Sequence, residues 1–188
     1  MNFKTDNRSL LIATGLAKNT KNSITKHGVL HTLSHYPHPD VRKLVAKHNN
    51  THKDTLHKLS DHTDPFNTDD VRIAVANHNN THQDTLHKLA SDPNPDVRWD
   101  VTFNNNTHQD TLHKLSNDPD KYVRRAVALN NNTHQDTLHK LSDDDKWQIR
   151  ELVALNNNTH QDTLHKLSSD PSEYVRLAAQ QRLSELKG

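Results

Sequence analysis

The chain has 188 residues, and its 24 lysines and arginines against 23 aspartates and glutamates leave a formal net charge of +1. Its hydrophobic content is 30% and its mean hydropathy is −1.03, but chains that are disordered by composition usually carry a high net charge as well. The near-neutral balance disfavours nucleic-acid binding, because phosphate contacts favour a basic excess. Cysteine is absent, which excludes disulfides, thiolate zinc sites and cysteine-ligated iron–sulfur clusters.

The N-terminal segment is predicted to end in a plain apolar helix. The stretch SLLIATGLA at 9–17 resembles a short signal peptide, but Asp6 and Asn7 interrupt the charged residues before it. No run approaches the ~20 apolar residues that a bilayer span needs. We therefore expect a cytoplasmic protein without a membrane partner.

One polar phrase recurs along the rest of the chain. NNNTHQDTLHKLS occurs at 104–116, 130–142 and 156–168, and NNTHQDTLHKLA occurs at 79–90. The aligned threonines are Thr25, Thr51, Thr81, Thr107, Thr133 and Thr159, spaced by 26, 30, 26, 26 and 26 residues. A four-residue insertion in SDHTDPFNTDD explains the longer spacing. Fixed self-similarity at this period predicts a repeat array of about six units.

Each unit is predicted to contain two short helices. The first is expected to begin after Thr133 as N-cap, with Asp136 three residues on in a capping-box-like arrangement. The second is expected to begin with Asp118 as cap and Pro119 at the first helical position. Helices of ~8–10 residues are marginal alone, so neighbouring units should stack into an α-solenoid. The apolar residues expected to face inward are Leu138 and Leu141 of the first helix and Val123, Ala126 and Val127 of the second.

The unit DPDKYVRRAVALNNNTHQDTLHKLS resembles the leucine-rich repeat variant family, whose pattern is DPxxxVRxxVAxxxNTxxxxLxxL, over residues 25–188. The end, DPSEYVRLAAQQRLSEL, is also similar to HEAT-type repeats. The resemblance implies an all-α, right-handed superhelix of α- and shorter, often 3₁₀, helices without a sheet. This sequence carries Asn and His where the family usually has Pro. We expect an N-terminal capping region at 1–24, repeats at 25–174 and a C-terminal capping helix at 175–188.

The histidines form rows rather than chelating pairs. Within a unit they are spaced i,i+5, which places them on different helix faces, and packed helices lie ~8–10 Å apart. We interpret them as solvated or stacking side chains, so no metal and no cofactor is expected. The best-spaced set, for which a zinc or nickel site is the alternative, is His27, His31 and His35.

A row of arginines follows the threonines, from Arg42 to Arg176. The row could track phosphates, but the favoured interpretation is a ladder between repeats in which each Arg pairs with a nearby helix-capping Asp. The candidate pairs are Asp92 and Asp96 with Arg98, and Asp118 with Arg124. Asparagines at the inward end of the second helices are expected to cap backbone groups where repeats meet. These asparagines are Asn104, Asn130 and Asn156.

Departures from the repeat mark candidate partner-binding residues. Asp100 occupies an inward position that is Leu or Ala in other units, which is costly unless the carboxylate is paired. Trp99 beside it should point outward, either as an interface anchor or lying flat on a neighbouring helix. Trp147, which stands where the preceding unit has Lys121, and Phe66 in the insertion are further candidates.

Two residues of the phrase itself recur without a packing reason. His139 and Lys140 should face water, yet their equivalents are nearly unchanged in the last four units. The units are either recent duplications or the contacts of a ligand that itself repeats, so both residues are candidate contacts.

Catalysis finds little support in the sequence. The three glycines, Gly15, Gly28 and Gly188, form no phosphate-cradling loop, and abundant His, Asp and Ser make accidental triads inevitable. We therefore expect a non-enzymatic scaffold that binds a protein partner through one curved face. The alternative is a solenoid that binds a polyanion or nucleic acid with its His, Lys and Arg rows.

Overall fold

The computed structural model describes Gly15 and residues 23–61 and 69–186. Across these residues every regular element is a helix, which confirms the all-α prediction. Phe66 and, apart from Gly15, the apolar stretch at 9–17 lie outside the described residues. The chain divides into two compact units, Met1–Asn106 and Thr107–Gly188, and each is considered by itself. None of the described helices is long and apolar enough to cross a bilayer.

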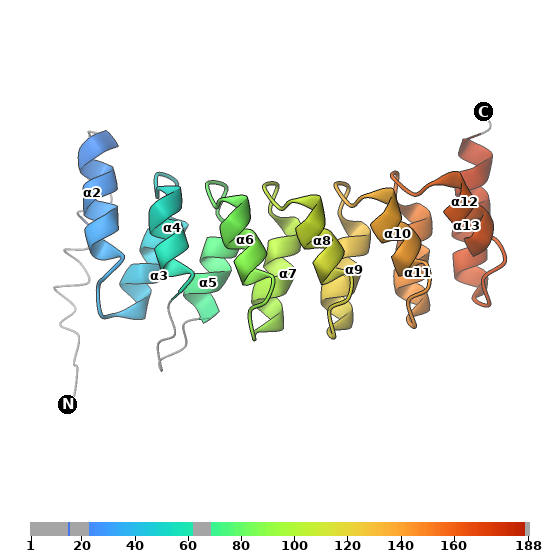
Figure 1. Ribbon diagram of the computed structural model, residues 1–188, viewed down its shortest axis with the longest axis horizontal. Coiled ribbons are helices and arrows are strands. Elements are labelled where there is room, and N and C mark those ends of the chain that lie inside the picture. The colour runs from blue at the N-terminus through green and yellow to red at the C-terminus, as the bar shows by residue number, and fades with distance from the viewer. Residues whose placement is uncertain (1–14, 16–22, 62–68, 187–188) are drawn as a thin grey trace. The chain divides into compact units, whose positions relative to one another are not determined.

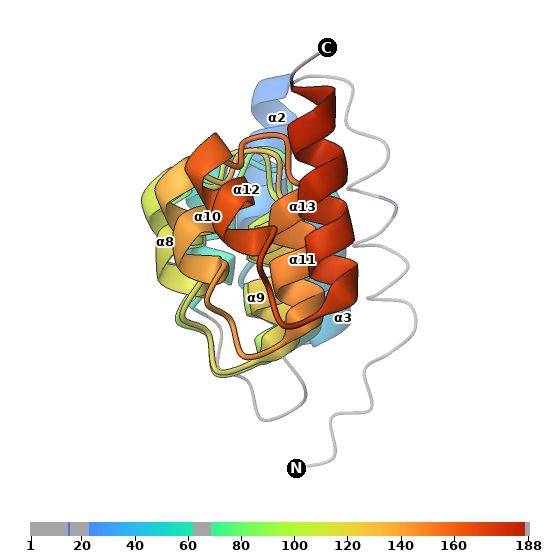
Figure 2. The same cartoon turned by 90° about the vertical axis from the view of Figure 1, so that its right-hand side faces the viewer.

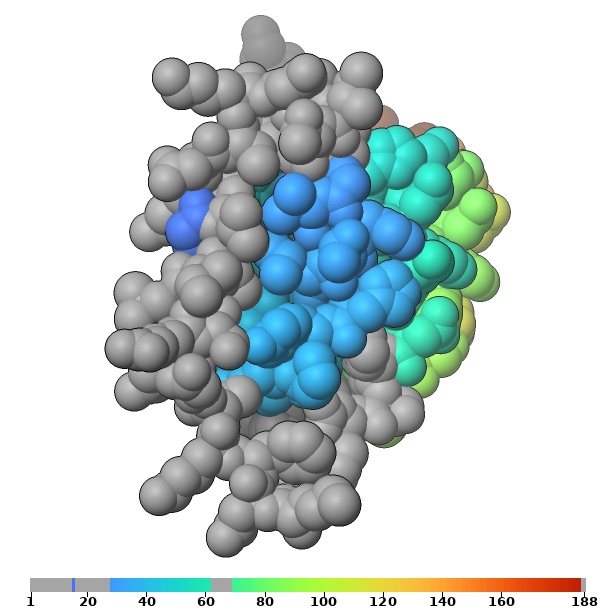
Figure 3. Space-filling model, turned by 90° about the vertical axis from the view of Figure 1, so that its left-hand side faces the viewer, coloured from blue at the N-terminus to red at the C-terminus, as the bar shows by residue number. Residues whose placement is uncertain are grey.

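The first unit is a stack of short helices in two layers (Figure 1). One layer is a series in which α3 packs on α5 and α5 on α7, and the other contains α4 and α6. Figure 3 looks onto the end of this unit where α2 and α3 lie. The helices are α2 (Ser23–Leu33), α3 (Pro39–Lys47), α4 (Lys53–Leu59), α5 (Asp69–Ala76), α6 (Gln83–Leu89) and α7 (Pro95–Phe103).

The second unit repeats this arrangement. Figure 2 shows α8, α10 and α12 on one side and α9, α11 and α13 on the other. We call α4, α6, α8, α10 and α12 the first helices, and α3, α5, α7, α9, α11 and α13 the second helices. Stacked pairs of this kind form an α-solenoid, as the sequence period predicts. The helices are α8 (Gln109–Leu115), α9 (Lys121–Leu129), α10 (Gln135–Leu141), α11 (Trp147–Leu155), α12 (Gln161–Leu167) and α13 (Glu173–Glu185).

The core lies between the two layers of each unit. Each first helix contributes two leucines that are no more than 2% exposed, and the second helices contribute valines and alanines. The inward positions predicted in the fourth and fifth repeats, including Leu138, Val123 and Ala126, are all buried. Burial of a leucine side chain contributes about 1.5–3 kcal/mol, so such pairs can hold helices that are too short to be stable alone.

The first helices are capped by histidine, and the prediction that Thr133 is the N-cap is wrong. The Nδ1 atom of His134 accepts a hydrogen bond from the backbone N–H of Asp136 at 3.3 Å, and the helix begins at Gln135. Thr133 is fully buried, and its hydroxyl donates to the carbonyl oxygen of Val127 at 2.7 Å. That carbonyl belongs to the last turn of the preceding helix, where backbone acceptors lack helical partners. Thr133 therefore caps the C-terminal end of the preceding helix.

The predicted cap of the second helix in the fourth repeat is two residues too early. Asp120 is the N-cap of α9, and its side chain accepts from the backbone N–H of Tyr122 at 2.7 Å. Asp118 instead accepts from the backbone N–H of Asp120 at 2.9 Å, within the loop. Proline does occupy the first helical position in α3 and α7, at Pro39 and Pro95.

Candidate protein-binding face

The arginine row forms a ladder between repeats, as predicted, but with a different acid from the one expected. Arg124 donates from Nε to Asp144 Oδ2 at 2.7 Å and from Nη2 to Asp144 Oδ1 at 3.2 Å. Its Nη1 donates to the carbonyl oxygen of Asp118 at 2.9 Å, so the nearby acid offers backbone and not its carboxylate. Arg150 pairs in the same way with Asp170, and its hydrogen bond lowers the pKa of that carboxyl. The guanidinium of each of these arginines thus joins the loop before its own helix to the following repeat.

The histidines within the first helices, such as His113 and His139, also join repeats. His139 Nδ1 lies 2.9 Å from the hydroxyl oxygen of Thr163 in the following repeat, and His113 lies 3.0 Å from that of Thr137. These contacts give a framework reason for the recurrence of His139. An exposed histidine in this row therefore needs no ligand to explain it.

A lysine that recurs in the first helices contacts the preceding repeat, whereas the histidines contact the following one. Lys166 Nζ donates to Ser142 Oγ at 3.0 Å and to Asp143 Oδ1 at 2.6 Å, both in the preceding repeat. Lys140 has Asn117 at the position that corresponds to Asp143. The recurrence of lysine is explained by this bridge, while the repeat before Lys140 has no acid at that position.

Asparagine side chains form hydrogen bonds with backbone carbonyl oxygens between repeats, as predicted. The side-chain amide of Asn156 donates to the carbonyl oxygens of Ala128 at 2.8 Å and of Asn130 at 3.1 Å. Asn104 makes the same bond to Ala76 at 2.6 Å. Since both asparagines are buried, these bonds satisfy polar groups that would otherwise be costly inside the stack.

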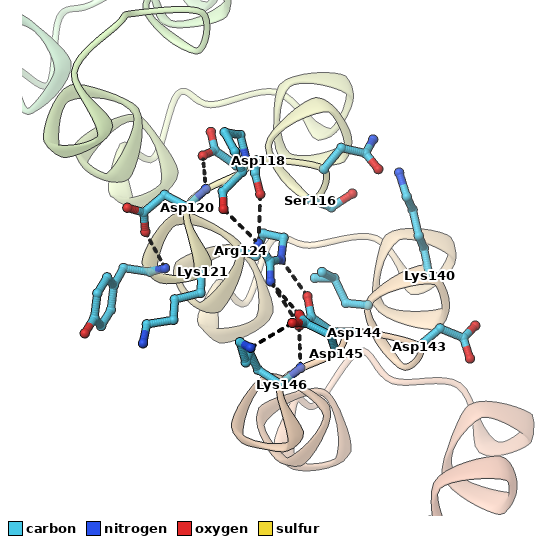
Figure 4. Close-up of a pocket in the computed structure, with 14 residues that line it drawn as sticks. Ser116, Asp118, Asp120, Lys121, Arg124, Lys140, Asp143, Asp144, Asp145 and Lys146 are labelled. Atoms are coloured by element: carbon cyan, nitrogen blue, oxygen red, sulfur yellow. Dashed lines mark hydrogen bonds and ion pairs between the residues drawn. The ribbon is translucent and has the colours of Figure 1, made fainter.

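A hollow of about 750 Å³ lies between the loop before α9 and the loop before α11 (Figure 4). Asp144 is tied to Arg124, and Asp145 contacts both Arg124 and Lys146 at 2.9 and 2.8 Å. The hydrogen bond from Lys146 lowers the pKa of Asp145. Asp143 is paired with Lys166. These acids are already used by the framework, and no group of three or more metal-ligating side chains occurs in the described part of the chain.

The exposed apolar side chains are confined to the second helices. In the described residues, every large hydrophobic side chain that is well exposed lies on a second helix or directly after α13, and none lies on a first helix. Their exposed fractions run from 36% for Trp147 to 62% for Tyr174. In the first unit they are Leu44, Trp99 and Phe103; in the second they are Tyr122, Leu129, Trp147, Leu155, Tyr174, Leu177 and Leu186. We call the set in the second unit its apolar face.

Both tryptophans lie on these second helices. Trp99 is 42% exposed, and its ring packs against Phe103 of its own helix with centroids 4.6 Å apart. Trp147 stacks on Tyr174 of the neighbouring helix, with centroids 4.9 Å apart and 21° between the planes. Trp99 therefore points outward as predicted, while Trp147 also makes a packing contact.

Asp100 lies inward, as its register predicted, and is 8% exposed. Burial raises the pKa of its carboxyl, and a side-chain hydrogen bond with Asn77 opposes that shift. Asp100, His139 and Lys140 stay predictions as partner contacts.

Sequence reasoning missed the tyrosines and leucines of the apolar face. The signal was available: YVR at 122–124 and 174–176 has an aromatic residue where DVR at 40–42, 70–72 and 96–98 has an acid.

No family model and no curated protein matches the sequence. The structure is similar to a leucine-rich repeat variant at 22% identity, covering 94% of this chain and 82% of that one, with a TM-score of 0.38. It is similar to an engineered protein at 14% identity, covering 100% and 97%, with a TM-score of 0.44. It is also similar to a designed armadillo repeat protein at 17% identity, covering 94% and 98%, with a TM-score of 0.41. The leucine-rich repeat variant family stays a resemblance.

Proposed function

We propose that the chain is a non-enzymatic scaffold that binds a protein partner through its second helices. The single observation that carries this proposal is the distribution of exposed large apolar side chains, which among the described residues all lie on those helices or directly after α13. Interfaces are enriched in aromatic residues, and exposed apolar patches mark interaction sites. The first helices offer an internal contrast, because their solvent-facing residues are polar.

The alternative, a polyanion-binding solenoid, would use the histidine, lysine and arginine rows. Several of their members are engaged within the framework: Arg150 with Asp170, Lys166 with Asp143 and His139 with Thr163. A phosphate would have to compete with these contacts. The net charge of +1 supplies no general attraction for a polyanion.

The proposal is tested by capture of partners from the native host on the immobilised chain. Tyr122→Ser and Leu155→Ser remove apolar side chains of the apolar face that are 59% and 51% exposed. Gln135→Ala and Gln161→Ala are the matched controls, since both glutamines are exposed on first helices. A protein lost with the serine variants and kept with the controls is the expected result. Equal capture by all variants contradicts the proposal, and capture of nucleic acid that falls steeply with salt favours the alternative.

A further inference from the structure

A second hollow, of about 270 Å³, opens on the apolar face between α9 and α11. Tyr122 at its edge is 59% exposed, whereas Ile149 is 2% exposed, so the hollow combines an open ring with a buried apolar side chain. Its lining residues are Lys121, Tyr122, Arg125, Lys146, Gln148 and Ile149.

The charges that line this hollow are all positive. Lys146 Nζ lies 2.8 Å from Asp145 Oδ2, so this lysine already has an acidic partner. Lys121 and Arg125 have no acidic partner among the described residues. Lys121 Nζ lies 5.0 Å from the centroid of the Tyr122 ring, a cation–π distance. Two exposed cations therefore lie beside an exposed aromatic ring, and neither is paired with a carboxylate from the described part of the chain.

The aromatic pair includes a residue that is adjacent in sequence to two residues lining the cationic hollow. Trp147 lies between two lining residues, Lys146 and Gln148, and stacks on Tyr174 of α13. Tryptophan, tyrosine and arginine are the residues most enriched among those that contribute most of the binding energy at protein interfaces. The second helices of the second unit thus carry exposed cations and exposed aromatic rings.

We infer that this hollow binds an acidic segment of the protein partner. Carboxylates of the segment contact Lys121 and Arg125, and an adjoining apolar side chain packs on Tyr122 and Trp147. This inference rests on the proposed function and adds the chemistry of the partner. A short acidic segment needs only the local charge, whereas a nucleic acid needs a basic excess that this chain lacks.

The test is selection of a displayed random peptide library on the immobilised full chain and on three variants. Arg125→Glu and Lys121→Glu reverse the two unpaired charges. Lys53→Glu is the matched control, since Lys53 is an exposed lysine on α4 in the first unit. Circular dichroism of each variant establishes that the helices are retained. One enriched peptide is then synthesised, and its affinity is measured by fluorescence anisotropy.

The expected result is enrichment of peptides that combine Asp or Glu with aromatic or aliphatic residues. Their affinity should fall at least tenfold with Arg125→Glu and remain unchanged with Lys53→Glu. Enriched peptides without acids, or equal binding by Arg125→Glu, overturn the inference. Tighter binding of a single-stranded oligonucleotide than of the selected peptide also overturns it. If capture of a host protein still depends on Tyr122 and Leu155 in that case, only the inference about an acidic segment fails, and the proposed function stands.

Discussion

Arg124 and Asp144 form a two-point ion pair that joins consecutive repeats, with N···O distances of 2.7 and 3.2 Å. The Asp144 side chain is 4% exposed, and that of Arg124 is 15% exposed. A further hydrogen bond of the guanidinium, to the carbonyl oxygen of Asp118, ties down the loop that precedes its own helix. One side chain thus determines both the turn within a repeat and the register between repeats.

Arg124→Ala should destabilise the chain by about 2–4 kcal/mol, because it leaves the buried Asp144 carboxylate without its partner. Arg125→Ala, a neighbouring exposed arginine, is the control and should change stability by less than about 0.5 kcal/mol. Urea denaturation followed by circular dichroism measures both. Equal stability of the two variants would show that water can replace the hydrogen bonds that the Arg124 guanidinium makes.

Stability should depend on pH through Asp170, whose pKa is lowered by Arg150. A carboxyl with a lowered folded-state pKa contributes stability above its unfolded pKa of about 3.9, and that contribution is lost as the pH falls through the folded value. Denaturation midpoints between pH 7 and pH 3 should therefore fall less steeply in Arg150→Ala than in the native chain. Parallel pH profiles for the two proteins would refute this coupling.

Asp100→Ala should stabilise the chain at neutral pH by about 1 kcal/mol, because it removes a buried charge. Burial raises the pKa of Asp100 in the folded chain. The free-energy cost of burying its charge is therefore absent below the pKa of the unfolded chain and is fully present once the pH has risen through the pKa of the folded chain. The gain should therefore shrink toward pH 4. Ala74 and Ala126 occupy the same register, so alanine fits there. A variant less stable than the native chain at pH 7 would indicate that the bond to Asn77 outweighs the burial cost.

Trp99→Ala should weaken partner binding by more than about 2 kcal/mol while leaving the helical signal unchanged. The ring is 42% exposed and packs only on Phe103 among the described aromatic side chains, so little core is lost. Calorimetric titration with the captured partner measures the binding, and Gln83→Ala on α6 is the control. Loss of helicity in the variant would identify Trp99 as a packing residue.

The sequence predicts the repeat and its inward leucines because these follow from the fixed period between units and the helical periodicity within each unit. It predicts that the arginines form a ladder but not their acidic partners, since Asp144 lies in the repeat after that of Arg124. The caps were predicted wrongly because Thr133 and His134 are adjacent, and both carry atoms that can bond to backbone. The threonine is drawn to Val127 of the preceding helix, and that contact exists only once the loop has folded. The pairing of His139 with Thr163 depends on how repeats are offset in the stack, which no single unit encodes.

The central claim, that the second helices bind the partner, is tested most directly by hydroxyl-radical footprinting of the chain with and without the captured protein. Side-chain oxidation of Trp147, Tyr174 and Leu177 should fall on binding, because these exposed residues lie on the apolar face. Oxidation of His113 and His139 on the first helices should not change. Protection of the histidines with unchanged oxidation of Trp147 and Tyr174 would contradict the account.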